Sequence, residues 1–190
     1  NSTWLASGVF LLTFATVGGI SESQTTIKSK KDPKKEWAVV KGFRSALFGM
    51  DEKQVLDAAA KDFKISKLTI EKKIKRSVHP TQKTEVLSFI VPKLWAIGGD
   101  AEVAYIMGYK SKKLIQVNVR WGGGVKVQRS DPKVTSKDIL ATGNLLRDHF
   151  MKKKYKKKGF ITNAKINDKV LMLFRGRDEK NRMVALVLAN

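Results

Sequence analysis

The chain has 190 residues, and its 38 Lys and Arg residues outnumber its 17 Asp and Glu residues to give a formal net charge of +21 at pH 7. It contains no cysteine, which excludes disulfides, thiol catalysis and cysteine-ligated zinc. Hydrophobic residues make up 42% of the chain, enough for a packed core, so a disordered basic tail is also excluded. Most of the cations are Lys, which favours diffuse attraction to anionic lipid, nucleic acid or an acidic protein over bidentate recognition of phosphate.

Residues 1–21, NSTWLASGVFLLTFATVGGIS, carry no charged side chain. A helix of this length would reach about 30 Å, the thickness of a hydrocarbon core, so the sequence predicts a transmembrane helix or uncleaved signal anchor. Gly8, Ala15 and Gly19 would share one face of that helix, where small residues let a partner helix approach closely. The alternative is a secretory signal peptide that is cleaved at residues 21–23.

Residues 22–36 form a polar linker with five lysines beside the predicted helix: Lys28, Lys30, Lys31, Lys34 and Lys35. Such lysines attract anionic headgroups, so we expect them to contact anionic lipid or an acidic partner. An apolar N-terminal segment is typical of export, and we therefore expect a protein of the bacterial inner membrane with a periplasmic body. Because a lysine cluster favours the cytoplasmic side, the cytoplasmic face of the membrane is the alternative.

The rest of the chain predicts a helix followed by strands, first over residues 37–124. Asp51 is a suitable N-cap, and the segment after it has apolar residues at helical spacing, namely Val55, Leu56, Ala59, Ala60 and Phe63. Strand-like segments follow at residues 84–91, 101–109 and 113–121.

The same order recurs over residues 125–190. Thr135 or Ser136 caps a second helix, and strand-like segments follow at residues 160–166, 169–174 and 183–188. The predicted fold class is therefore α+β: an N-terminal transmembrane helix, then a helix-plus-antiparallel-sheet domain made of two helix-then-three-strand repeats.

The second predicted helix ends in a run of six lysines: Lys152, Lys153, Lys154, Lys156, Lys157 and Lys158. Lysine near a helix C-terminus is favourable against the helix dipole, but six exceed that need. The run is interpreted as an anionic contact site, with an ordinary solvated face as the alternative.

The residues that could carry catalysis show no suitable arrangement. His79 and His149 have no ligand partner at metal-binding spacing, and there is no G-x-S-x-G nucleophile elbow. The sequence therefore predicts no enzyme, no cofactor and no metal. Nucleic acid is a less favoured partner, because Tyr105, Tyr109 and Trp121 lie among apolar strand residues and are expected in the core.

Phe48-Gly49-Met50-Asp51, followed by Val55 and Asp62-Phe63, resembles the opening of small bacterial envelope domains. These are the domains of the β-lactamase-inhibitor-protein-like and small outer-membrane-lipoprotein type, in which a Gly-Met turn precedes a helix packed on an antiparallel sheet. The resemblance covers the first repeat and implies an exported adaptor that binds protein without catalysis. The chain departs from the lipoproteins because it has no lipobox cysteine, which excludes a lipid anchor.

Together these features predict a non-catalytic, membrane-anchored accessory or adaptor subunit of a larger, energy-transducing envelope complex. Its expected partners are integral membrane protein subunits and either anionic lipid or an acidic protein surface. The alternative is a secreted or periplasmic binder of an anionic polymer, either nucleic acid or polysaccharide.

Overall fold

The computed structural model describes residues 9–16, 35–76, 83–122, 125 and 134–189. Within them the strands are β1 (Val9–Ala15), β2 (Gly42–Phe43), β3 (Ala46–Leu47), β4 (Glu71–Arg76), β5 (Lys83–Trp95), β6 (Gly99–Met107), β7 (Leu114–Gly122), β8 (Ile161–Asn167), β9 (Val170–Arg177) and β10 (Met183–Ala189). The helices are α1 (Glu52–Phe63), the 3-10 turn η1 (Lys67–Thr69) and α2 (Ser136–Met151).

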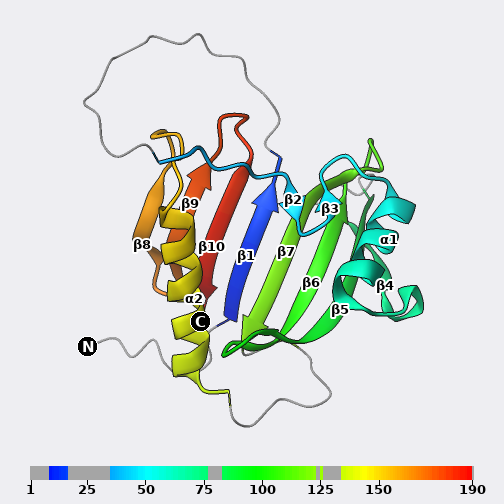
Figure 1. Cartoon of the computed structure of the whole chain (residues 1–190), viewed down its shortest axis with the longest axis horizontal. Coiled ribbons are helices and arrows are strands. Elements are labelled where there is room, and N and C mark those ends of the chain that lie inside the picture. Colours follow the sequence, from blue (N-terminus) through cyan, green and yellow to red (C-terminus); the bar gives the residue numbers. More distant parts are fainter. Residues whose placement is uncertain (1–8, 17–34, 77–82, 123–124, 126–133, 190) are drawn as a thin grey trace.

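Eight of the described strands form one antiparallel sheet in the order β4-β5-β6-β7-β1-β10-β9-β8, which we call the large sheet. Strand β1 lies in its interior (Figure 1) and pairs on both sides, so that Leu12 is opposite Val119 of β7 and Leu186 of β10. β2 and β3 form a separate small hairpin.

The predicted transmembrane helix is wrong, because residues 9–15 are a strand of the large sheet. In the described part of the chain, no helix is long and apolar enough to cross a membrane. The predicted fold class is therefore wrong, because an eight-stranded antiparallel sheet that includes β1 dominates the described residues. The predicted inner-membrane location, which depended on the same helix, is not supported. Ala15 lies buried in β1 rather than on a helix face, and Gly8 and Gly19 fall outside the described residues.

The predicted pair of helix-then-three-strand repeats is also corrected by the strand order. Helix α1 is followed by β4, β5, β6 and β7, whereas α2 is followed by β8, β9 and β10. β1 lies beside β10 and gives the second half its fourth strand, although it precedes both helices in the chain. Counted outward from the β7–β1 boundary, one half of the large sheet contains β7, β6, β5 and β4. The strands at the corresponding positions of the other half are β1, β10, β9 and β8.

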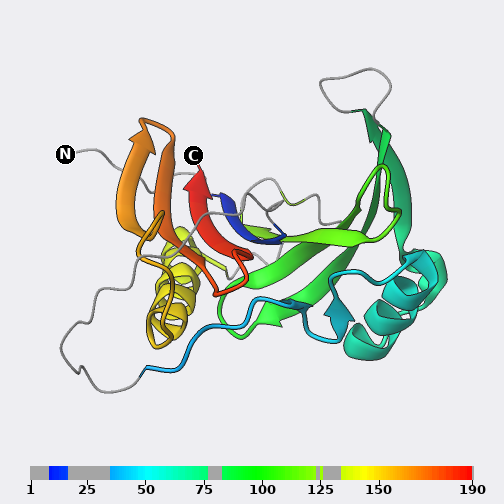
Figure 2. The same cartoon turned by 90° about the horizontal axis from the view of Figure 1, so that it is seen from above.

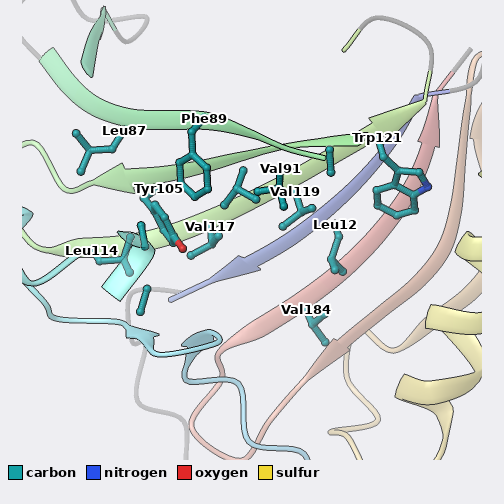
Figure 3. Close-up of a cluster of buried hydrophobic side chains, with 14 of the residues drawn as sticks. Leu12, Leu87, Phe89, Val91, Tyr105, Leu114, Val117, Val119, Trp121 and Val184 are labelled. Carbon is teal, nitrogen blue, oxygen red and sulfur yellow. The ribbon is translucent and has the colours of Figure 1, made fainter. Parts of the chain in front are cut away.

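Helices α1 and α2 cover the same face of the large sheet, one over each half (Figure 2). The covered face is apolar: in β6 the buried positions alternate with half-buried ones, and Ala101, Val103, Tyr105 and Met107 are the buried apolar residues. Alternation of this kind is typical of a strand with one face on a core. Trp121, Leu12 and Val184 continue that core across β7, β1 and β10 (Figure 3).

Aromatic rings form a continuous series through this core and connect the two helices. Phe150 of α2 contacts Phe14 of β1 at 6.5 Å between ring centroids, and Phe14 stacks on Phe43 of β2 at 5.7 Å. Phe43 in turn stacks on Phe63 of α1 at 6.2 Å. Such pairs add about 0.5–1.5 kcal/mol beyond their burial, so β1 also connects the helix layer.

Both helices begin at the caps that the sequence predicts. The Asp51 side chain accepts from the Gln54 backbone N–H at 3.0 Å, and the Gln54 side chain accepts from the Asp51 N–H at 3.0 Å. Thr135 and Asp138 form the equivalent capping box of α2. The end of α1 is less regular, because its C-cap residue Lys64 has a left-handed backbone conformation with φ of 54°.

Replacing Leu12 by Ala tests the placement of β1. Leu12 is 1% exposed, and we expect its truncation to lower the free energy of unfolding by about 2–5 kcal/mol in urea denaturation. Leu11→Ala, at a half-buried position of the same strand, is the control and should cost less. Equal, small effects of the two substitutions would show that β1 does not lie in the core.

Lys64→Gly should stabilise the protein by about 0.5–1 kcal/mol, because glycine adopts the left-handed C-cap conformation without a Cβ clash. Lys61→Gly makes the same chemical change at an exposed position of regular helix and should destabilise by about 1 kcal/mol. Chemical denaturation measures both, and effects of equal sign would contradict the left-handed assignment.

Candidate anion-binding surface

The described lysines predicted to contact an anion gather where α2 ends. We call Lys35, Lys152, Lys153, Lys154, Lys156, Lys157 and Lys158 the lysine cluster. Lys152 is the C-cap of α2, and Lys153–Lys158 lie in the connection from α2 to β8. Lys35 belongs to the segment that runs along this connection, whereas Lys28, Lys30, Lys31 and Lys34 fall outside the described residues.

Backbone hydrogen bonds fix the connection that carries the cluster. The Lys154 N–H donates to the Glu36 carbonyl at 2.8 Å, and the Ala38 N–H donates to the Lys154 carbonyl at 2.9 Å, which forms a parallel bridge. The Lys156 N–H donates to the Arg177 carbonyl of β9 at 2.9 Å. The lysines are therefore presented from ordered backbone rather than from a free tail.

Tyr155 anchors the middle of the connection in the core. Its ring contacts Phe174 at 5.1 Å and stacks on Phe160 at 6.2 Å between centroids. Gly176 makes room for it, because a Cβ built there would lie 2.5 Å from Tyr155 Cδ1. Burial, with a smaller contribution from the negative charge of Asp178, raises the pKa of Tyr155 to about 12.

A buried carboxylate holds the neighbouring segment in place. Asp178 is 1% exposed and accepts from the backbone N–H of Val40 at 2.9 Å, and from the backbone N–H and Nε of Arg182 at 2.9 Å each. Arg182 neutralises the charge of Asp178, and the three donors replace its hydration. The bond to Val40 ties residues 35–40 to the turn between β9 and β10.

Three lysines of the cluster contact neutral groups, and these contacts do not compensate the positive charge of the lysines. Lys35 Nζ donates to the Met151 carbonyl at 3.1 Å, and Lys156 Nζ donates to Asn181 Oδ1 at 2.8 Å. Lys154 Nζ lies 4.4 Å from the centroid of the Trp37 ring, a cation–π contact. The cluster therefore maintains a strongly positive potential at the end of α2.

Lys153 differs because it pairs with a carboxylate, Glu36 Oε2, at 2.7 Å. A hydrogen bond from Lys153, together with its positive charge, lowers the pKa of Glu36 below the ordinary value. Both side chains are exposed, so this ion pair contributes little to stability.

A cavity of about 440 Å³, widely open to solvent, lies beside the cluster between the C-terminal part of α2 and β8. It is lined by Lys35, Arg147, Asp148, Met151, Lys152, Thr162 and Asn163. Lys35 and Lys152, two of the predicted contact residues, thus line one cavity although 117 positions separate them. We did not predict Arg147, Thr162 and Asn163 from the sequence, and the i, i+4 spacing of Arg147 and Met151 was the available signal for a shared helix face.

The described residues show no arrangement suited to metal binding: no group of three or more His, Asp and Glu side chains could hold an ion. His149 is exposed on α2 with its ring 5.7 Å from Phe150, and His79 falls outside the described residues. The surface offers cations and hydrogen-bond donors, which attract an anion.

Comparison of the chain with protein-family models, curated proteins and solved structures found no match. The resemblance of residues 48–63 to bacterial envelope domains stays a prediction.

The anchoring role of Tyr155 can be tested by titration. Its pKa of about 12 exceeds the ordinary 10.0, so the folded state holds this proton more tightly than the unfolded state. The contribution of Tyr155 to stability is therefore complete below pH 10 and declines as the pH rises towards 12. Ultraviolet absorbance is followed against pH for the wild type and for Tyr155→Phe. The difference between the two titration curves gives the ionisation of Tyr155.

Gly176→Ala is the matching structural change, because the added methyl group displaces the Tyr155 ring. We expect the pKa of Tyr155 to fall towards 10.0 in this variant, since the ring becomes more exposed. An unchanged pKa in a folded Gly176→Ala protein would show that Tyr155 does not pack on this glycine.

Proposed function

We propose that this chain is a non-catalytic binding module that contacts the phosphate backbone of a nucleic acid through the lysine cluster, without reading its sequence. The observation that carries the proposal is the ordered display of the cluster at the end of α2, with Lys35, Lys154 and Lys156 held by neutral partners. Each lysine that neutralises a phosphate releases condensed counterions, which favours binding.

The position of β1 in the large sheet favours the second predicted function, a binder of an anionic polymer, over the membrane-anchored adaptor. The membrane-anchored adaptor depended on a transmembrane helix, and residues 9–15 are instead a central strand. An anionic polymer therefore accounts better for the excess of 38 Lys and Arg over 17 Asp and Glu residues.

Sequence-independent contact follows from the residue types at the surface. Lysine ammonium groups act as point charges, which suits phosphates but does not distinguish base edges. Of the three aromatic residues expected in the core, Tyr105 and Trp121 are fully buried and cannot stack on bases, whereas Tyr109 is 37% exposed in the turn after β6. Nucleic acid is favoured over polysaccharide because each of its nucleotides carries a phosphate, so the lysine cluster would meet a regular and dense series of anions.

Charge removal from the cluster provides the test. The triple variant Lys152→Gln/Lys157→Gln/Lys158→Gln should bind a single-stranded oligonucleotide on the order of tenfold or more weakly than the wild type. The slope of log affinity against log salt should fall by about 2, since roughly 0.7 counterion is released per single-strand phosphate contact. Fluorescence anisotropy over a salt series measures both quantities.

The matched control makes the same charge change at three exposed lysines away from the cluster, Lys61→Gln/Lys75→Gln/Lys137→Gln. It should retain most of the affinity and most of the salt slope. Equal losses in the two triple variants would contradict a localised surface and indicate attraction by net charge alone. Binding to heparin with none to the oligonucleotide would favour the polysaccharide alternative.

A further inference from the structure

We propose that the cavity between α2 and β8 binds a phosphate monoester group, supplied by the terminal phosphate of a nucleic acid or by a small phosphate ester. The first source rests on the proposed function, whereas the recognition of phosphate itself does not. The cavity volume of about 440 Å³ lies at the lower end of the range for small-ligand sites. It therefore has room for a phosphate group together with the first atoms of the molecule that carries it.

Arg147 provides the donor best matched to a phosphate. Its Nε and one terminal nitrogen donate to Asp148 Oδ1 at 2.9 and 2.8 Å, and the other terminal nitrogen donates to Asn163 Oδ1 at 3.2 Å. A guanidinium has five N–H groups, so one on each terminal nitrogen has no partner among the described residues. These two N–H groups, which we call the fork of Arg147, remain available to donate to phosphate oxygens.

The orientation of that fork is fixed before a ligand arrives. Arg147 is held from two elements, by Asp148 on its own helix and by Asn163 on β8, and its side chain is 24% exposed. Asn163 has φ of 51°, a left-handed conformation that asparagine tolerates better than most residues. A preoriented side chain loses less conformational entropy on binding, which favours recognition over a flexible lysine alone.

Two ammonium groups complete the cationic lining. Lys35 Nζ donates one hydrogen to the Met151 carbonyl at 3.1 Å, which leaves donors for a further acceptor. Lys152 is exposed at the C-cap of α2 and lines the same cavity. Thr162 adds a hydroxyl group, so donors of three chemical types surround the space.

The charge balance favours a doubly charged ligand. Lys35, Arg147 and Lys152 contribute three positive charges, against one negative charge on Asp148 and about half a negative charge at the C-terminus of α2. The remaining charge is about +1.5, which attracts a phosphate monoester dianion more strongly than a singly charged diester or carboxylate. Since the second pKa of such a monoester is about 6, binding should strengthen as the pH rises through that value.

The experiment uses the full chain and two probes. Inorganic phosphate is titrated while the Arg147 Nε–H resonance is followed by NMR, with the Arg175 and Arg182 Nε–H resonances as internal controls. Oligonucleotides of one sequence, with a 5′-phosphate or a 5′-hydroxyl, are compared by anisotropy. We expect a saturable shift at Arg147 and a preference of at least about threefold for the 5′-phosphate.

Two variants separate the cavity from the wider surface. Arg147→Lys keeps the charge but removes the fork, and it should abolish both the phosphate shift at the cavity and the 5′-phosphate preference. For this variant the phosphate titration is read at the Asn163 amide. Lys157→Gln lies in the cluster outside the cavity lining, and it should weaken both oligonucleotides equally while the preference persists.

The outcomes distinguish this proposal from the proposed function. A phosphate shift with equal oligonucleotide affinities supports the cavity and assigns a small phosphate ester as its source. A phosphate shift with no oligonucleotide binding overturns the proposed function alone. No phosphate shift together with equal affinities overturns the cavity proposal, as does a 5′-phosphate preference that Arg147→Lys retains.

Discussion

The insertion of β1 between β7 and β10 is the constraint on which the rest of the structure depends. In the described residues the two halves of the large sheet are joined through this strand, because β7 and β10 each pair with β1 and not with one another. Its side chains also connect the helix layer, where Phe14 lies between Phe150 of α2 and Phe43 of β2. The relative position of α1 and α2 is therefore set by one short apolar segment.

That constraint reaches the candidate site through a series of buried contacts. Phe14 contacts Phe150, Phe150 contacts Phe174, and Phe174 contacts Tyr155 in the middle of the lysine cluster. Asp178 adds a polar attachment, because its bond to the Val40 N–H fixes the segment that carries Lys35. The segments that carry the lysine cluster are therefore packed directly on the core. This packing offsets the mutual repulsion of the lysines.

The sequence predicted the features that depend on neighbouring residues. The start of α1 at Asp51 and the start of α2 at Thr135 follow from local spacing. The run of six lysines was expected within the last turns of α2, but the helix ends at Met151 and Lys153–Lys158 lie in the connection after it. The sequence did not predict β1, since a short and almost uninterrupted apolar run has no polar alternation to distinguish a strand from a helix. The cavity also escaped prediction, because Lys35 meets Met151 across 116 positions of the chain.

The separation of β1 from its partners in the chain also affects how the molecule acquires its structure during synthesis. Val9 of β1 pairs with Ala189 of β10. β1 is the first described element to be synthesised and β10 is the last, so one edge of β1 has no partner strand until β10 is made. Helix α1 and strands β4–β7 can pack early and β1 can pair with β7, whereas the other edge of β1 stays unpaired and prone to aggregation until β10 is made. Translation speed and chaperone access should therefore influence the yield of this protein more than they would for a fold whose central strands are adjacent in sequence.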